Sequence, residues 1–202
     1  MRAAIALLLA VGLAGCGSVP FSPWPDTDRP ALARELQQLD TWEVHARLAL
    51  RAGEHSAQAG LQWTRDGARH TIVLRGPFGQ GLARLTRDAD GAHLQDAEHN
   101  HHEAESAEAL LLKTTGWRIP VDGLDYWIRG LPAPGVPHEP ALDETGRLAV
   151  LRQSGWEIRF SDYRRYGRYE LPGFLVLRFP PGAAEDEGLE TRLVIDRWVF
   201  AP

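Results

Sequence analysis

The sequence predicts a mainly β fold with some α-helix: a curved antiparallel sheet that closes or nearly closes into a barrel, with helices on its concave face. Three observations predict it. Apolar residues recur with a period of two in several segments, for example from Trp42 to Leu50. Turn signals such as Asp66-Gly67 and Asp90-Gly91 separate these segments. Helical patterns lie between two blocks of strands, an order that suits helices packed on one sheet.

The first block contains five expected strands, each joined to the next by a short turn. A short amphipathic helix over residues 31–40 precedes them, because Leu32, Leu36 and Leu39 recur at helical spacing. The strands are expected at residues 42–50, 57–63, 70–74, 82–86 and 93–95. Strands joined in this way form a meander, and meanders close or nearly close into barrels.

The middle of the chain contains the two main helical patterns. Residues 104–115 are the clearest helix, with Ser106 near its N-cap and Gly116 as its stop. A second helical stretch covers residues 121–131, between Pro120 and Pro132, and a proline-rich loop follows at residues 131–140. The last strands are expected at residues 148–153, 156–161, 174–179 and 189–200.

Composition is typical of a soluble globular domain. The chain has 202 residues, of which 44% are hydrophobic and 24% charged, and its formal net charge is −5. These values exclude a disordered or multi-span membrane chain and favour a single domain. No basic footprint indicates nucleic-acid binding. Cys16 is the single cysteine, so an intrachain disulfide is excluded.

The N-terminus carries a secretory pattern. Met1-Arg2 is a basic start, and the apolar run that follows is too short to span a bilayer. The end of this pattern, Leu13-Ala14-Gly15-Cys16, resembles the lipobox of bacterial lipoproteins. That resemblance implies a signal peptide over residues 1–15 and a lipid anchor on Cys16. Gly17 stands where enteric lipoproteins retained in the inner membrane carry Asp, which favours the periplasmic face of the outer membrane.

These patterns divide the chain into three parts. The signal peptide covers residues 1–15. A lipid-anchored flexible tether covers residues 16–30, which are rich in proline and lack periodicity. One domain covers residues 31–202.

Catalytic and metal signatures are weak. His99, His101 and His102 cluster in a polar run, but no distant pair completes a metal site, so a solvated loop is the favoured interpretation. The sequence has no P-loop, no dinucleotide fingerprint and no G-x-S-x-G elbow. We expect no enzyme activity, no cofactor and no metal.

The tryptophans allow two interpretations. Seven are present, and Trp42, Trp63, Trp156 and Trp198 fall in expected strands, on their apolar sides. They either fill a barrel core or line an apolar cavity for a hydrophobic ligand. The triplet of leucines at residues 110–112 covers more than one stripe of its helix, which suits a lid.

The segment Gly76-Pro77-Phe78-Gly79 interrupts the strand pattern. Turn tips are normally polar and exposed, so an aromatic residue at this tip is unusual. Phe78 either folds back onto the core or is exposed, and an exposed ring on a membrane-anchored protein can enter the lipid interface.

Several motifs, in order, resemble the outer-membrane lipoprotein LolB family. The strongest is Leu124-x-x-Trp127-Ile128-x-Gly130-Leu131-Pro132. The others are the lipobox, Arg47-Leu48-Ala49-Leu50, Gln62-Trp63, Leu74-Arg75-Gly76-Pro77-Phe78-Gly79, Gly116-x-x-Ile119-Pro120-Val121, Gly155-Trp156, Tyr163, Leu171-Pro172 and Ile195-x-x-Trp198. The resemblance extends from Cys16 to about Phe200.

This resemblance implies a fold and a function. The fold is an unclosed antiparallel β-barrel with a helical lid over an apolar cavity. The function is to accept acylated lipoproteins from a periplasmic LolA-like carrier and insert them into the outer membrane without nucleotide hydrolysis. We further expect a monomer whose partners are the carrier, acylated lipoproteins and outer-membrane lipid.

The resemblance also implies site residues. The protruding loop of the family carries an apolar residue, usually Leu, that serves membrane insertion; Phe78 takes that place here, flanked by Gly76, Pro77 and Gly79. Exposure of Phe78 is therefore expected. The candidates for lining the acyl-chain cavity are Leu61, Trp63, Trp127 and Trp156, some of which are alternatively core residues.

Three rival functions remain. A lipoprotein scaffold or assembly subunit would use the same anchor and a protein-binding surface, and a filled barrel would support it. A lipid-modifying hydrolase would need a nucleophile beside a histidine in the cavity. A soluble carrier is the third, and the lipobox opposes it.

Overall fold

The computed structural model describes residues 29–116, 119–181 and 188–201. The expected signal peptide, Cys16 and the tether up to residue 28 lie outside the described residues. The first helix, α1 (Arg29–Gln38), begins slightly earlier than the sequence pattern indicates. Among the described residues, no helix has both the length and the apolar character that a bilayer crossing requires.

One large antiparallel sheet dominates the described part of the chain. Eleven strands take part, in the order β6-β5-β4-β3-β2-β1-β13-β12-β9-β8-β7. Their bounds are β1 (Thr41–Ala52), β2 (His55–Asp66), β3 (Arg69–Arg75), β4 (Gly81–Asp88), β5 (Gly91–Asp96), β6 (His101–Ala104), β7 (His138–Leu142), β8 (Leu148–Gln153), β9 (Trp156–Ser161), β12 (Phe174–Phe179) and β13 (Leu189–Phe200). The short strands β10 (Arg164–Tyr166) and β11 (Tyr169–Leu171) pair separately.

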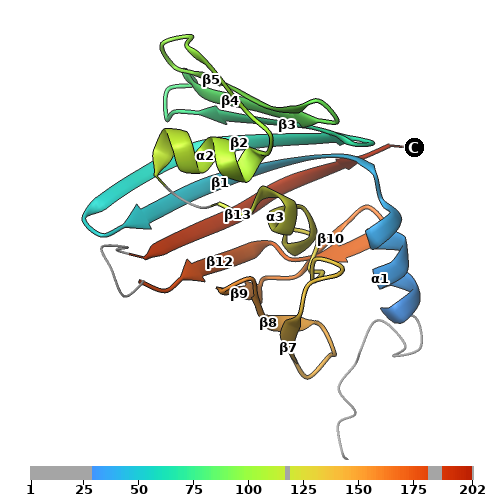
Figure 1. The fold of residues 1–202 in the computed structure, drawn as a ribbon. Helices are drawn as coiled ribbons and strands as arrows, with labels where there is room; N and C mark the ends of the chain where they lie inside the picture. The colour runs from blue at the N-terminus through green and yellow to red at the C-terminus, as the bar shows by residue number, and fades with distance from the viewer. Residues whose placement is uncertain (1–28, 117–118, 182–187, 202) are drawn as a thin grey trace, which may run out of the picture.

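The sheet bends strongly but does not close. β6 and β7 are its two edges and do not pair with each other. Two helices, α2 (Ala107–Thr115) and α3 (Val121–Trp127), lie across its hollow side, while α1 packs at one end (Figure 1). The architecture is therefore the expected unclosed antiparallel β-barrel, with helices over its concave face.

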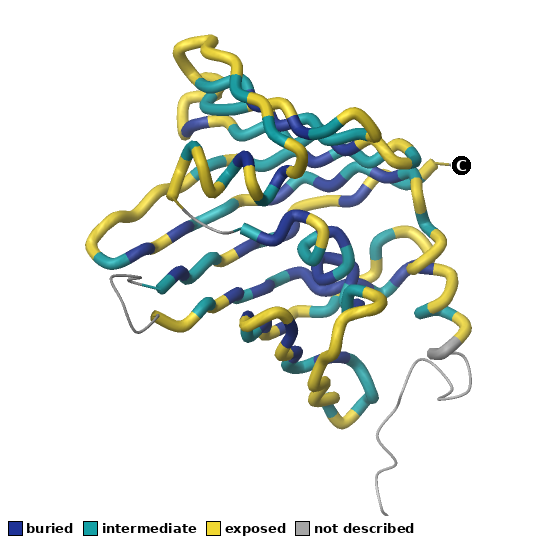
Figure 2. Tube along the Cα trace, in the orientation of Figure 1, coloured by how far each residue is buried: buried dark blue, intermediate teal, exposed yellow. Residues whose placement is uncertain are grey.

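Alternation along the strands builds the inner wall. Cross-strand pairing places Val44, Trp63, Ile72, Leu85 and Leu94 in one row across five consecutive strands. Successive residues of a strand point to opposite faces, so this row fixes which face of each strand points inward. Figure 2 shows the resulting alternation of buried and exposed positions along the strands.

Local signals set the limits of α2. The Ser106 hydroxyl oxygen accepts a hydrogen bond from the Ala109 backbone N–H at 3.2 Å, which caps the N-terminus. Gly116 ends the helix with a φ of 77°, and its N–H donates to the Leu112 carbonyl at 3.0 Å. That left-handed conformation suits glycine, which has no Cβ to clash.

The structure differs from the sequence expectations where strands are short and polar. The predicted histidine loop contains β6, so the first block has six strands rather than five. The predicted proline-rich loop contains the start of β7. β6 and β7 pair with β5 and β8 respectively, and their strand conformation depends on these partners, not on alternation of apolar residues.

The helices are also shorter than expected. α2 begins at Ala107 rather than residue 104. α3 ends at Trp127 rather than residue 131, because Gly130 follows with a φ of 72°.

Candidate functional site: an apolar cavity and an exposed aromatic loop

An apolar cavity of about 190 Å³ lies between the concave face of the sheet and the helices α2 and α3. Every lining residue is apolar except Thr115 and Thr191. The sheet contributes Val44, Ala46, Leu48, Leu50, Leu61, Trp63, Ile72, Leu74, Ala83, Leu85, Leu94, Trp156, Leu177, Thr191, Leu193 and Ile195, and the helices with their flanks contribute Leu111, Thr115, Ile119, Pro120, Val121, Leu124 and Ile128. Such a surface suits a hydrocarbon ligand and leaves polar groups without partners.

The predicted cavity residues separate into two groups. Leu61, Trp63 and Trp156 line the cavity. Trp127 does not: it is fully buried, and its indole N–H donates to the Gln153 side-chain oxygen at 2.8 Å. Its ring lies 6.3 Å from that of Trp156. Trp127 is therefore a core residue that supports Trp156 from behind.

A buried histidine holds Trp63 in the wall. The Trp63 indole N–H donates to His70 Nδ1 at 3.1 Å. Burial, and then the positive charges of Arg87, Arg65 and Arg129, lower the pKa of His70 from 6.5 to about 3. The ring is therefore neutral at physiological pH, and the Trp63 indole has an acceptor that leaves its apolar surface facing the cavity.

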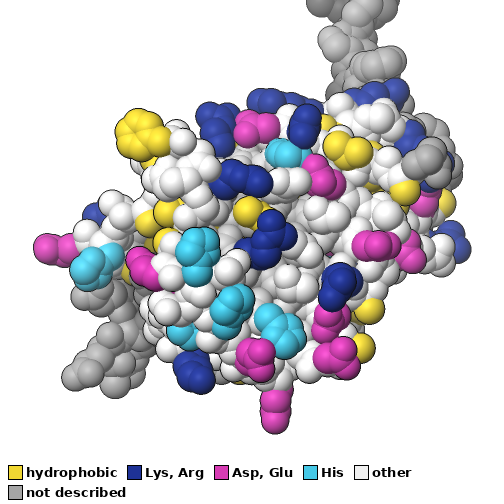
Figure 3. Space-filling view, turned by 90° about the horizontal axis from the view of Figure 1, so that it is seen from above, with side chains coloured by type: hydrophobic (Ala, Val, Ile, Leu, Met, Phe, Trp, Pro, Cys, Tyr) yellow, Lys and Arg dark blue, Asp and Glu magenta, His cyan; other side chains and the backbone are white. Residues whose placement is uncertain are grey.

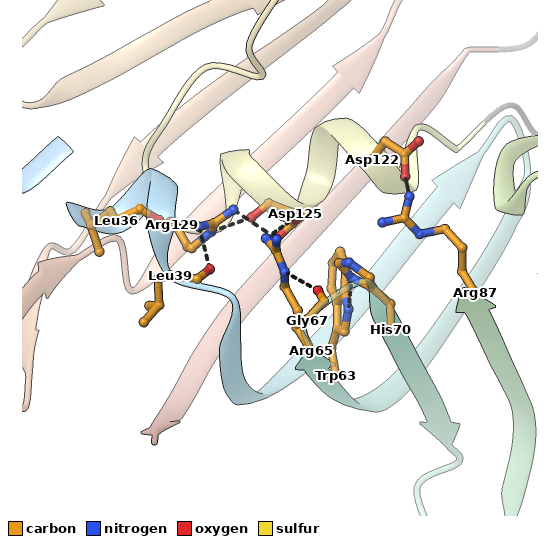
Figure 4. Close-up of polar contacts among 10 residues, drawn as sticks. All are labelled: Leu36, Leu39, Trp63, Arg65, Gly67, His70, Arg87, Asp122, Asp125 and Arg129. Carbon is orange, nitrogen blue, oxygen red and sulfur yellow. Dashed lines mark hydrogen bonds and ion pairs between the residues drawn. The ribbon is translucent and has the colours of Figure 1, made fainter. Parts of the chain in front are cut away.

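Helix α3 is held in place by buried charges (Figure 4). Asp125 binds Arg65 of β2 at 2.8 Å and Arg129 at 3.0 Å. Arg129 in turn donates to the backbone carbonyls of Leu36 and Leu39 at the end of α1. One buried carboxylate thus connects α3 to both the sheet and α1.

The electrostatics of this network reflect its burial. Loss of hydration raises the pKa of Asp125 above its ordinary value, although two arginines bind it. The same loss lowers the pKa of Arg129. Removing one partner would leave a buried charge unpaired, so the network fixes the position of α3. At the other end of α3, Asp122 pairs with Arg87 of β4 in an exposed contact.

Helix α2 closes the cavity from a different side. Ala107 and Leu110 are buried against the sheet, and α2 contacts β4, β5 and β6. Leu111 and Thr115 face the cavity, while Leu112 is 39% exposed. Of the three consecutive leucines, Leu110 therefore packs in the core, Leu111 lines the cavity and Leu112 faces solvent.

The loop between β3 and β4 projects an aromatic ring into solvent. Phe78 is 95% exposed, which is the largest exposed fraction among the large hydrophobic residues described. The Gly79 N–H donates to the Gly76 carbonyl at 2.9 Å, and the Phe78 N–H donates to the Gln80 side-chain oxygen at 3.1 Å. Pro77 occupies the second position of this turn, where its fixed φ is favoured. The tip is thus a defined turn that presents Phe78 outward.

Loop and cavity share the same two strands. Leu74 of β3 and Ala83 of β4 pair with each other and line the cavity, and the loop joins their strands a short distance beyond. The exposed ring therefore lies at the end of the cavity wall, and the segment combines an apolar inner surface with a projecting apolar tip.

A larger hollow of about 990 Å³ lies beyond Trp156 and is open to solvent. Its lining includes Arg51, Arg152, Arg178 and three glutamates, so it does not suit a hydrocarbon.

The histidine run holds no assembled metal site. His102 pairs with Asp96 at 3.2 Å, and Asp96 also accepts hydrogen bonds from Asn100. These bonds, above all the one from the Asn100 side chain, lower the pKa of Asp96 to about 2. Within the described residues, no group of three or more potential ligands is placed to hold a metal ion.

Sequence reasoning missed two parts of this site. The inner residues of β3 and β4, among them Ile72 and Leu85, follow the same alternation that identified Leu61 and could have been found by it. The Asp125–Arg129 pair has the helical i, i+4 spacing, which was a usable signal. Its partner Arg65 is distant in sequence, and no local signal connects the two.

An unclosed antiparallel sheet with helices over an apolar cavity defines a fold class whose interior suits a hydrophobic ligand. Solved structures share this fold. A LolA superfamily protein from Nitrosomonas europaea is 8% identical, with a TM-score of 0.55, and the match covers 86% of this chain and 93% of that one. A putative outer membrane lipoprotein-sorting protein domain from Vibrio parahaemolyticus is 10% identical, with a TM-score of 0.51, covering 84% and 91%.

Sequence comparison gives the family. Residues 40–198 match the family described as outer membrane lipoprotein LolB. The outer-membrane lipoprotein LolB of Nitrosococcus oceani is 38% identical over 98% of this chain and 96% of its own length. That of Chromohalobacter salexigens is 36% identical over 98% and 90%, and that of Pseudomonas aeruginosa is 38% identical over 82% and 77%. The chain belongs to the LolB family.

Proposed function

We propose that this protein accepts acylated lipoproteins from a periplasmic LolA-like carrier and inserts them into the outer membrane. The acyl chains enter the apolar cavity, the Phe78 loop contacts the membrane, and Cys16 carries the lipid anchor on the periplasmic face. Delivery needs no nucleotide hydrolysis and no cofactor, and the protein acts as a monomer.

The observation that carries this proposal is the connection between cavity and loop. Leu74 and Ala83 line the cavity on the strands that end in the Phe78 turn. The two strands that form this part of the apolar wall lead directly into the turn that presents the exposed ring. An interior that only stabilised a fold would not require an exposed aromatic tip, because exposing Phe to water opposes solubility.

The size of the cavity implies that it opens. An apolar cavity of about 150 Å³ holds one benzene ring. The cavity of about 190 Å³ in this chain is therefore too small for the acyl chains of a lipoprotein, so binding requires the cavity to enlarge. Because α3 is held by buried charges, we assign the opening movement to α2, whose described core contacts, Ala107 and Leu110, are apolar.

A passive relay is sufficient for the transfer. Exposing an acyl chain to water costs about 0.8 kcal/mol for each methylene, so chains leave one apolar site only for another. Each acceptor must hold the cargo more favourably than its donor, and the bilayer must hold it more favourably than this cavity. Such an ordering gives direction without an energy source.

Two rival functions receive less support from the structure. A scaffold would favour a filled barrel, whereas this sheet encloses an apolar space. A lipid hydrolase would need a nucleophile beside a histidine, and the described cavity lining contains no His, Ser or Cys.

The test follows the cargo between two proteins. The Cys16→Ala variant, which stays soluble, is mixed with a LolA-like carrier loaded with a triacylated lipoprotein, and pull-down shows which protein holds the lipoprotein. We expect movement to this protein, in one direction and without ATP. If the cargo stayed on the carrier while the variant was folded, the receptor function would be rejected.

A further inference from the structure

The outer face of the sheet next to the Phe78 loop carries two arginines. Leu74 and Ala83 point into the cavity, so their strand neighbours Arg75 and Arg84 point to the opposite, solvent-exposed face. Pairing places Arg84 opposite Val73, two residues from Arg75 on the same face. Both arginines therefore lie on the outer face of the two strands that lead into the turn presenting Phe78.

Arg75 and Arg84 differ from most of the other arginines on the outer face in their lack of a carboxylate partner. Several of those positive charges are balanced by carboxylates: Arg47 pairs with Asp196 at 3.0 Å, Arg159 with Glu157 at 2.8 Å and Arg192 with Glu190 at 2.7 Å. Arg51 and Arg197 are exceptions, since they contact the Gly53 carbonyl and His45 respectively. Figure 3 views the molecule from above, where Lys and Arg side chains lie among acidic and histidine side chains and hydrophobic side chains project at the margins.

Among the residues that the structure describes, no carboxylate forms an ion pair with either arginine beside the loop. Arg75 donates to the neutral Gln62 side-chain oxygen at 3.0 Å. Arg84 makes no hydrogen bond or ion pair with any residue in the part of the chain that the structure describes. Its cross-strand neighbours, Val73 and Gln95, are uncharged. The pair therefore keeps its positive charge available to an outside partner.

We propose that Arg75 and Arg84 bind the phosphate of anionic membrane lipids when the Phe78 loop enters the bilayer interface. This inference rests on the proposed function, because it requires that the loop meets a membrane. An aromatic ring at headgroup depth, with guanidinium groups beside it, matches the layered chemistry of the interface. The chain has a net charge of −5, so an anionic surface would repel it as a whole, and a local cationic pair at the point of contact offsets that repulsion.

The test measures binding of the soluble Cys16→Ala protein to vesicles by co-sedimentation. Vesicles of phosphatidylcholine alone are compared with vesicles that also contain phosphatidylglycerol. We expect tighter binding to the anionic vesicles, weakened by salt. Replacing both arginines (Arg75→Gln, Arg84→Gln) should reduce binding to anionic vesicles by roughly tenfold and leave binding to neutral vesicles unchanged.

A matched control carries the same change of charge. Arg159→Gln with Arg192→Gln removes two exposed arginines from β9 and β13, on the other side of β1 in the sheet. Glu157 and Glu190 each keep a second arginine partner, Arg152 and Arg178 respectively. We expect this control to keep the preference for anionic vesicles.

Three results would overturn the inference: no anionic preference in the parent protein, an unchanged preference in the Arg75/Arg84 variant, or an equal loss in the control. The carrier-to-protein transfer assay contains no membrane and is run on the same preparations. Failure of cargo transfer rejects the proposed function, whereas normal transfer with an unaltered vesicle preference rejects the lipid-phosphate contact alone.

Discussion

At the scale of single residues, Phe78 is the side chain whose position is hardest to explain by folding. A phenylalanine that is 95% exposed contributes almost nothing to the core. The turn around it is well ordered by hydrogen bonds from Gly79 and to Gln80, so the ring is held outward. This arrangement makes the role of Phe78 separable from stability.

Phe78→Glu should therefore block delivery and preserve the fold. We expect the free energy of unfolding to change by less than about 0.5 kcal/mol, because the site is exposed. Cargo should still arrive from the carrier, but its insertion into vesicles should fall by roughly tenfold, because a carboxylate avoids the membrane interface. Urea unfolding and a vesicle-insertion assay measure the two effects.

Leu142→Glu is the matched control, since Leu142 is also exposed, at 60%, but lies on the edge strand β7. It should deliver cargo normally. Normal insertion by the Phe78 variant, or an equal defect in the Leu142 variant, would show that the loop has no special role.

His70 predicts a pH dependence of stability. The pKa of His70 is lowered from 6.5 to about 3 in the folded protein. Between these pH values His70 is neutral in the folded protein but protonated in the unfolded chain. Stability therefore falls as the pH drops from 6.5 towards 3. Between pH 7 and pH 5 this histidine alone should reduce the free energy of unfolding by about 2 kcal/mol.

His70→Gln keeps an acceptor for Trp63 and removes the titrating group. Urea unfolding at both pH values should therefore show a loss on acidification that is smaller in this variant than in the parent protein. An identical loss in the two proteins would contradict the assignment of a neutral, buried His70.

Sequence reasoning could decide the direction of some of these residues and left others open, for physical reasons. Trp63 lies on an alternating strand, so its inward direction follows from the period of two. Phe78 was ambiguous from the residues alone, because a turn tip can fold back or project. Trp127 was a candidate for the cavity or the core, and local pattern could not decide because its contact with Gln153 joins segments that are distant in sequence.

At the scale of elements, the two helices over the cavity are held by different forces. α3 is fixed by the Asp125 network to β2 and α1, whereas α2 buries Ala107 and Leu110. Apolar contacts are non-directional and can be exchanged for contacts with an acyl chain. Buried charge pairs cannot be exchanged in this way, which supports α2 as the moving element.

The two aspartates of α3 provide a comparison within one helix. Asp125→Ala leaves Arg129 buried without its carboxylate and should reduce the free energy of unfolding by about 3–5 kcal/mol. Asp122→Ala removes an exposed pair with Arg87 and should cost at most about 1 kcal/mol. Denaturant midpoints measure both, and similar losses in the two variants would contradict a special role for the Asp125 network.

The long strands were predictable as elements, but the short ones were not. β8, β9, β12 and β13 have the bounds expected from alternation and turn residues. β6, β10 and β11 are three or four residues long, so alternation cannot identify them. Their strand conformation depends on pairing with a neighbour, a tertiary effect that local pattern does not encode.

At the scale of the whole molecule, the open sheet explains how one chain can both bind and release a hydrocarbon. In a closed barrel the number of strands and their stagger fix the diameter, and hydrogen bonds hold every edge. Here β6 and β7 stay unpaired with each other, so helices rather than strands complete the enclosure. The cavity can then enlarge by moving a helix, without breaking the hydrogen bonds of the sheet.

The bend of the sheet and the volume of the cavity were beyond sequence reasoning, because they depend on the packing of all the strands together.

The central claim is that acyl chains occupy the cavity, and site-specific crosslinking tests it most directly. Leu61 faces the cavity, whereas its neighbour Gln62 points to the outer face and contacts Arg75. A photoreactive amino acid is placed at either position of the Cys16→Ala protein, which then receives lipoprotein from a loaded carrier and is irradiated. We predict crosslinks to the lipoprotein from position 61 and none from position 62. Crosslinks from position 62 alone, or equally from both positions, would contradict occupancy of the cavity by acyl chains.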